Sequence, residues 1–219
     1  MNRHWILCAA LASTALLAPT HATAQDKTPL KIVVGFPPGG SADTLARLVA
    51  EALRERYAPV VVENRPGAGG RIALNQVKRA DPDGQTVILL PSGPMVLFPH
   101  VYKKLDYNAV TDFSPVSLLA RFQFGVVAGP STPAKSVQDM IARAKAEPGK
   151  SSYGTPGLGT LPHFMGVLFE QKAGAQLNHV PFQGGGPANN ALLGGHIDYK
   201  FDVVSETAEF HRSGKARII

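Results

Sequence analysis

The sequence predicts an exported α/β protein of two lobes, and three observations support this fold class. Short β-branched runs alternate with amphipathic helical stretches, and Gly- or Pro-rich turns join most of them. An irregular stretch over residues 98–116 interrupts the alternation, which favours two separate sheets over one. The first 24 residues have the pattern of an export signal.

The signal pattern consists of Arg3, an apolar run over residues 6–18, and a small-residue cleavage site at Ala22, Thr23 and Ala24. The apolar run is shorter than the roughly 20 residues that a membrane-spanning helix needs. We therefore expect a signal peptide over residues 1–24. The single cysteine, Cys8, lies inside it, so the mature chain has no thiol for a disulfide, a nucleophile or a metal ligand.

Residues 25–123 are predicted to form the N-terminal portion of lobe 1. Strands are expected over residues 30–36, 60–63 and 86–90, and helices over residues 43–56 and 72–80. The first of these helices has an apolar stripe at helical spacing, made by Leu45, Leu48, Val49, Ala52 and Leu53.

Residues 124–219 are predicted to form lobe 2 and the start of a return strand. Expected strands cover residues 124–127, 151–154, 177–180 and 197–201, and expected helices cover residues 137–146, 163–173, 188–193 and 205–211. Strands that alternate with helices at this spacing predict parallel sheets with both faces covered. The last five residues begin a further strand.

The charge and motif content exclude several classes of function. The formal net charge is +6, but Lys and Arg are scattered, so no basic stripe predicts nucleic-acid binding. The histidines of the mature chain are widely spaced, and we expect no metal site. The chain also lacks a complete phosphate-binding loop, dinucleotide fingerprint or nucleophile elbow, so we expect no cofactor and no catalytic residues.

Three Gly-rich loops each follow a predicted strand and open a predicted helix. They are residues 37–43, residues 154–160 with His163 beyond them, and residues 183–187. A helix start offers unpaired N–H groups and the positive end of the helix dipole, so such loops can hold a carboxylate. Ser41 and Thr160 add hydroxyl donors.

The same residues have structural alternatives. Taken singly, each loop fits an ordinary turn followed by a helix N-cap. In the first loop the N-cap would be Ser41 or Asp43, and His163 near the second loop fits a surface or capping residue. Asp202 follows the strand expected over residues 197–201, where it fits either a ligand-binding residue or the N-cap of the next helix.

Six blocks in order carry a resemblance to a known family. They read PLKIVVGFPPGGSADTLARLVAEAL, VVVENRPGAGG, ADPDGQTVILL, YGTPGLGTLPHF, VPFQGGGPANNALLGGHIDYKFD and GKARII. From about Pro29 to the last residue, the sequence resembles the substrate-binding receptors of tripartite tricarboxylate transporters, also called Bug proteins. The resemblance implies a type 2 periplasmic-binding-protein fold, in which two α/β lobes joined by crossing strands close on a ligand. Family members continue for about another hundred residues, so the resemblance implies that the C-terminal part is missing.

The resemblance also implies a function and a site. It implies a periplasmic receptor, expected as a monomer, that captures a small organic mono- or dicarboxylate and delivers it to membrane permease subunits without catalysis. Together with the loop argument, it gives the expected ligand-binding residues as Phe36, Gly39, Gly40, Ser41, Asp43, Thr155, Gly159, Thr160, His163, Gln183, Gly184, Gly185 and Asp202.

This chain departs from the family pattern at two places. Family members usually have Tyr, then Lys or Arg, Gly, and Ser or Thr in the third loop, where this chain has Phe182, Gln183, Gly184 and Gly185. The position before Phe201 is commonly apolar and here is Lys200, which leaves open whether a cation faces the cleft.

Two other functions stay open at this point. One is a secreted hydrolase or isomerase that uses Ser41, His163 and either Asp43 or Asp202. The other is a ligand sensor for a signalling receptor. If the chain ends at Ile219, we also expect poor folding, because part of the first lobe would be absent.

Overall fold

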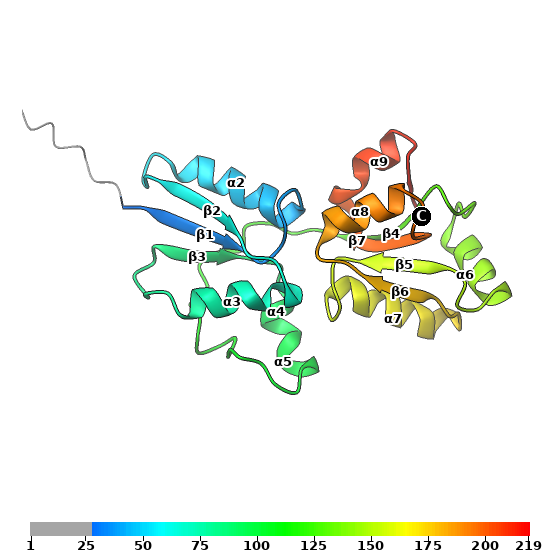
Figure 1. Ribbon diagram of the computed structural model, residues 1–219, viewed down its shortest axis with the longest axis horizontal. Coiled ribbons are helices and arrows are strands. Elements are labelled where there is room, and N and C mark those ends of the chain that lie inside the picture. Colours follow the sequence, from blue (N-terminus) through cyan, green and yellow to red (C-terminus); the bar gives the residue numbers. More distant parts are fainter. Residues whose placement is uncertain (1–27) are drawn as a thin grey trace, which may run out of the picture.

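The structure, a computed structural model, describes residues 28–219, so the expected signal peptide lies outside the described residues. Two α/β lobes lie side by side, and a long connection between α5 and β4 crosses from one to the other (Figure 1). Lobe 1 is built on strands β1 to β3, and lobe 2 on strands β4 to β8. The two-lobed α/β fold class is confirmed.

Lobe 1 has a three-stranded parallel sheet in the order β2-β1-β3. The strands are β1 (Leu30–Val34), β2 (Val60–Asn64) and β3 (Thr86–Leu89). Helix α2 (Ser41–Leu53) follows β1, and helix α3 (Arg71–Lys78) follows β2. Every second residue of β1, from Leu30 to Val34, packs with Ala46 and Ala50 of α2 because side chains alternate along a strand.

Two short helices lie at the start of the stretch that the sequence left irregular. The first, α4 (Gly93–Val96), lies just before residues 98–116, and the second, α5 (Phe98–Val101), opens them. Each has a proline in its first turn, where the missing N–H has no helical partner to lose. A single 3-10 turn, η2 (Ala68–Gly70), precedes α3. Beyond α5, residues 114–123 form neither helix nor strand and are exposed along their length.

Lobe 2 has a five-stranded sheet in the order β6-β5-β7-β4-β8. Its strands are β4 (Phe124–Ala128), β5 (Ser152–Thr155), β6 (Asn178–Pro181), β7 (Tyr199–Val203) and β8 (Arg217–Ile218). The prediction of purely parallel sheets is wrong here, because β4 runs antiparallel to both β7 and β8. The chain enters lobe 2 from the side of the other lobe, so β4 starts where its neighbours end, with Phe124 opposite Val203.

Helices cover both faces of the lobe 2 sheet. On one face, Met140 of α6 (Val137–Ala146) and Phe169 of α7 (Leu161–Ala173) pack with Tyr153 and Phe201. On the other, Leu192 of α8 (Gly185–Leu193) and Phe210 of α9 (Ala208–Arg212) pack with Val127. A 3-10 turn, η3 (Val204–Glu206), links β7 to α9. The three parallel strands β5, β6 and β7 all run toward lobe 1, so their carboxyl ends lie on the side that faces it (Figure 1).

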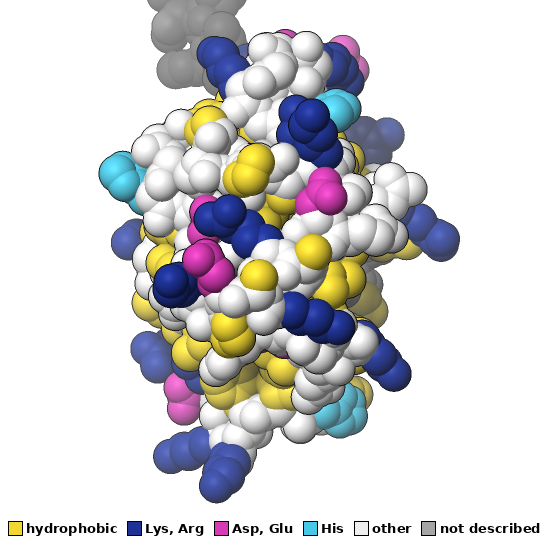
Figure 2. Space-filling view, turned by 90° about the vertical axis from the view of Figure 1, so that its right-hand side faces the viewer, with side chains coloured by type: hydrophobic (Ala, Val, Ile, Leu, Met, Phe, Trp, Pro, Cys, Tyr) yellow, Lys and Arg dark blue, Asp and Glu magenta, His cyan; other side chains and the backbone are white. Residues whose placement is uncertain are grey.

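Figure 2 views the molecule from the lobe 2 end, where Lys and Arg side chains are separated by apolar and neutral surface. Within residues 28–219, no helix is long and apolar enough to cross a membrane. Over the same residues, no three His, Cys, Asp or Glu side chains are grouped so that they could hold a metal ion.

Candidate functional site: a pocket between the lobes

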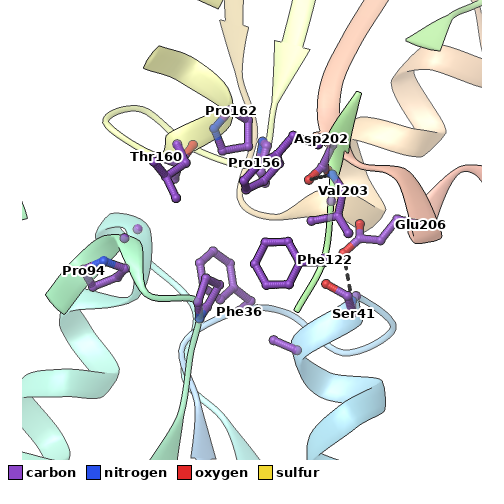
Figure 3. A pocket seen from close by; sticks show the side chains of 18 of the residues that line it. Phe36, Ser41, Pro94, Phe122, Pro156, Thr160, Pro162, Asp202, Val203 and Glu206 are labelled. Carbon is purple, nitrogen blue, oxygen red and sulfur yellow. Dashed lines mark hydrogen bonds between the residues drawn. The ribbon is translucent and has the colours of Figure 1, made fainter. Parts of the chain in front are cut away.

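A pocket with a cavity volume of about 70 Å³ lies between the two lobes. That volume accommodates several water molecules or part of a small organic molecule. From lobe 1 the lining comes from the loop after β1 with the start of α2, from η2 and from the α4–α5 region. From lobe 2 it comes from Phe122 and Phe124 at the entry, from the ends of β5 and β7, from η3, and from the starts of α7 and α8. Figure 3 shows Phe36 and Phe122 between Ser41 on one side and Thr160 on the other.

Six of the residues expected from the sequence line this pocket, namely Phe36, Gly40, Ser41, Thr160, Gly185 and Asp202. The other expected residues lie behind or beside the lining. Two of these, Gly39 and Gln183, are exposed outside the pocket, and Gly184 packs against the loop of lobe 1, because a Cβ there would lie 2.7 Å from Pro37 Cδ.

Asp43 holds the loop of lobe 1 in place. Its carboxylate accepts hydrogen bonds from the N–H of Gly39 at 3.0 Å, from Asn64 Nδ2 at 2.9 Å, and from two nitrogens of Arg47 at 3.0 Å each. Burial by itself would raise the pKa of Asp43, but the bonds from Arg47, Gly39 and Asn64 together lower it below its usual value. Asp43 is therefore saturated by protein partners. It lies in the first turn of α2, whose N-cap is Gly40.

The loop before α7 is supported by two stacked, half-buried histidine rings. His163 Nδ1 accepts the N–H of Gly159 at 3.2 Å, and its ring stacks on His179 with centroids 4.3 Å apart. His179 Nε2 lies 2.8 Å from Thr155 Oγ1. Burial, with the positive charge of a protonated His163 as a second cause, lowers the pKa of His179 to about 4, so His179 is a neutral ring at pH 7. His163, Thr155 and Gly159 thus shape the loop from outside the pocket.

Three of the longer helices, α2, α7 and α8, begin at the pocket without a side-chain cap, as the four-residue helix α4 also does. The N-cap residues are Gly40 for α2, Thr160 for α7 and Gly184 for α8, and none of them makes a side-chain capping hydrogen bond. Thr160 Oγ1 instead donates to the carbonyl of Gly157 at 2.7 Å. Helix α6, which starts away from the pocket, is capped by Ser136 in the usual way. First-turn N–H groups of α7 and α8 are therefore available to an anionic ligand.

The start of α2 is different, because a side chain of the protein already occupies it. Glu206 Oε1 accepts the N–H of Ser41 at 2.8 Å, which joins η3 of lobe 2 to α2 of lobe 1 (dashed line in Figure 3). The Glu206 side chain is 12% exposed. Glu206 was not among the site residues expected from the sequence. The feature that could have indicated it is its position, four residues after Asp202 in the turn that follows the same strand.

Glu206 belongs to a buried charged cluster with Lys200 and Asp202. Lys200 Nζ lies 2.7 Å from Asp202 Oδ2 and 3.8 Å from Glu206 Oε2, and it donates hydrogen bonds to Asn189 Oδ1 and the carbonyl of Gly185. Burial raises the pKa of Asp202, the nearby charge of Glu206 adds to this, and Lys200 opposes it. Lys200 is thus a buried cation behind the pocket, which answers the question that its position in the sequence left open.

Asp202 is not the N-cap of the helix that follows β7. The N-cap of α9 is Thr207, five residues later, and Asp202 Oδ1 instead accepts the N–H of Val203. Asp202 is 2% exposed and lines the pocket, and its role in ligand binding stays a prediction. Within residues 28–219, no Lys or Arg side chain lines this pocket.

The fold and the position of the pocket define a class of protein, the two-lobed periplasmic binding proteins. An ancestral amino acid-binding protein, AncCDT-1, shares the fold at 14% identity with a TM-score of 0.55. Residues 45–219 match the family described as the tripartite tricarboxylate transporter family receptor. The chain belongs to that family.

Individual relatives agree with this assignment. BugT of Bordetella pertussis is 33% identical over 95% of this chain and 65% of its own length. An adipate-bound protein of R. palustris is 32% identical with a TM-score of 0.83, covering 88% of this chain and 64% of that one. MatC of Rhodopseudomonas palustris with bound malate is 31% identical with a TM-score of 0.80, over 87% and 65%. The chain thus spans about two thirds or less of the length of these proteins.

Proposed function

We propose that this chain is the ligand-capturing part of an exported receptor that holds a small organic mono- or dicarboxylate between its lobes. The observation that carries the proposal is that the uncapped starts of α7 and α8 open into one pocket between the lobes. N–H groups and the positive helix ends there favour a carboxylate. The adipate and malate bound to two structural neighbours support the same ligand class.

The place and partners of the receptor belong to the same proposal. Family membership supports a periplasmic location and delivery of the ligand to membrane permease subunits. Sensing for a signalling receptor uses the same binding site and differs only in the protein that the loaded receptor contacts. A pull-down from membranes with and without ligand separates the two roles, because it recovers either a permease subunit or a receptor kinase.

The geometry argues against the hydrolase or isomerase that the sequence left open. Ser41 lies in lobe 1 with its N–H bonded to Glu206, whereas His163 lies behind the loop of lobe 2, bonded to Gly159 and stacked on His179. Asp43 is saturated by Arg47, Asn64 and Gly39. Among the described residues, no hydrogen bond joins the side chains of Ser41, His163 and Asp43, as it would for a nucleophile, a base and an orienting acid.

Calorimetric titration with malate and with adipate tests the proposal. We expect one ligand per chain, and NMR of the recovered ligand should show it unchanged. Replacing Thr160 by Val removes the hydrogen bond from its hydroxyl to the carbonyl of Gly157, which positions the α7 start, and should weaken binding about tenfold. Thr111→Val, at an exposed position remote from the pocket, should bind as the parent does. Conversion of either acid to a product would contradict the proposal.

A further inference from the structure

The Asp202 and Glu206 carboxylates give the pocket more acceptors than the protein satisfies. The buried cluster has two carboxylates and one ammonium. Asp202 Oδ2 has the Lys200 ammonium 2.7 Å away but no hydrogen bond of good geometry, and Glu206 Oε2 has its closest cation at 3.8 Å. Both oxygens are buried. A buried negative charge without a full complement of partners is costly, so this wall of the pocket favours an added donor or cation.

Lys200 has little capacity left to satisfy these oxygens. An ammonium has three N–H donors, and those of Lys200 face Asn189 Oδ1 at 2.6 Å, the carbonyl of Gly185 at 3.3 Å and Asp202 Oδ2. Lys200 itself is fully buried and does not line the pocket. Asp202 and Glu206 do line it, so of the three side chains in this cluster these two border the ligand space.

Gly185 keeps this wall open. A Cβ at position 185 would lie 1.8 Å from Glu206 Oε2 and 3.0 Å from Asp202 Oδ2, so only glycine allows the two carboxylates to meet the start of α8. Glu206 also uses its other oxygen to occupy the N–H of Ser41. Among the starts of α2, α7 and α8, that of α2 is thereby closed to a ligand carboxylate, while those of α7 and α8 stay uncapped.

We propose that Asp202 and Glu206 form a subsite for a cationic or N–H-donating group, so that the preferred ligand carries one carboxylate and one ammonium or amide, not two carboxylates. Figure 3 shows Glu206 and Thr160 on opposite sides of the pocket, so the two ends of such a ligand meet different walls. The carboxylate lies at the start of α7 and the nitrogen lies at Asp202 and Glu206. This inference rests on the proposed function for the carboxylate end only.

Titrations with matched compounds of four and six carbons test the subsite. Each set contains an amino acid with its amine at the far end of the chain, a dicarboxylate, a monocarboxylate and a simple amine. The four-carbon set is 4-aminobutanoate, succinate, butanoate and butylamine. The six-carbon set is 6-aminohexanoate, adipate, hexanoate and hexylamine. Of the two amino acids, we expect the one with the lower dissociation constant to bind at least about tenfold more tightly than the dicarboxylate of the same length, which corresponds to about 1.4 kcal/mol.

Three variants assign the preference to the subsite. Glu206→Gln keeps an oxygen for Ser41 N–H and Asp202→Asn keeps one for Val203 N–H, while each removes a negative charge. Each variant should bind the amino acid and the dicarboxylate of the same length with dissociation constants that differ by less than about threefold. Glu209→Gln, at a carboxylate that is 77% exposed, should leave the ratio of these two constants unchanged. Circular dichroism checks that each variant is folded. If only one of the two subsite variants folds, that variant alone tests the subsite.

The outcomes separate this inference from the proposed function. If the dicarboxylate binds more tightly than the amino acid in the parent chain, the carboxylate receptor stands and the subsite is overturned. If only the compounds with an amine bind, including butylamine or hexylamine, the subsite stands and the carboxylate proposal fails. If no compound binds to folded protein, both are overturned.

Discussion

Asp43 shows how a single side chain fixes the geometry of the pocket without lining it. It joins the loop after β1, helix α2 and the end of β2 through Gly39, Arg47 and Asn64. Its pKa is lowered, so its carboxylate stabilises the fold above the unfolded pKa of about 3.9, and that contribution is lost as the pH falls through the lower folded value.

Replacing Asp43 by Asn should lower the free energy of unfolding at pH 7 by about 1–2 kcal/mol, because the charge that pairs with Arg47 is removed. Urea denaturation measures the change. The matched control is Glu51→Gln in the same helix, whose carboxylate pairs with Arg54 at the exposed surface and should matter by less than about 0.5 kcal/mol. Equal losses from the two changes would contradict the role assigned to Asp43.

His179 supports the second loop as a neutral ring. Its folded pKa of about 4 is below the unfolded value of about 6.5, so the unfolded chain binds more protons between these values. Stability is therefore full above about pH 6.5 and falls as the pH drops toward 4. We expect the melting temperature to decrease between pH 7.5 and pH 4.5, and His179→Gln should reduce that decrease. His100→Gln, at an exposed position, should show the same decrease as the parent chain.

For single residues, the sequence was sufficient where position in a strand–turn–helix unit alone puts a residue at the pocket. Phe36, Ser41, Thr160 and Asp202 are such residues. The sequence could not separate ligand-facing residues from their supports. Asp43 and His163 lie in the same loops as lining residues, and only tertiary contacts with Asn64 and His179 show that they face inward. Glu206 was missed because its partner, Ser41, lies 165 residues earlier in the chain.

Among the elements, the start of α8 depends on the absence of a side chain at Gly185. Gly185→Ala should lower the free energy of unfolding by about 1–3 kcal/mol, because its Cβ overlaps the Glu206 carboxylate. Thermal or urea unfolding measures the cost. Gly186→Ala is the matched control: a Cβ there meets nothing within 4 Å, so it should be neutral or slightly stabilising.

A second change tests whether the cost at Gly185 comes from Glu206. In a Glu206→Ala background, Gly185→Ala should cost less than about 0.5 kcal/mol, since the overlapping atoms are gone. A cost that is the same in both backgrounds would show that it does not come from overlap with the Glu206 carboxylate.

The order of strands and helices was predictable because hydrophobic periodicity is local. The direction of β4 was not, because the sequence pattern of a buried strand is the same in either direction and the direction depends on where the chain enters the lobe. The short helices α4 and α5 were also missed. Each has four residues, too few for helical periodicity to be visible.

For the whole molecule, the connection that precedes β4 exposes apolar side chains that a folded protein usually covers. Val110 is 85% exposed, Val116 86% and Leu118 73%. Exposed apolar side chains of this kind bind hydrophobic dyes. We expect the chain to bind ANS at pH 7.

Replacing Val116 by Thr together with Leu118 by Gln should lower the ANS fluorescence without lowering the melting temperature, since neither side chain packs in a core. Fluorescence titration and a thermal melt measure the two effects. Unchanged ANS fluorescence would place the accessible apolar surface elsewhere.

The central claim is that a small carboxylate binds at the starts of α7 and α8, between the lobes. NMR mapping of backbone amides tests it most directly, with malate or 4-aminobutanoate as the ligand and the start of α6, which Ser136 caps, as the internal reference. The account predicts the largest shifts at Thr160, Leu161, Gly185 and Gly186, and small shifts at the first turn of α6. Largest shifts at α6, or equal small shifts throughout the chain at saturating ligand, would contradict it.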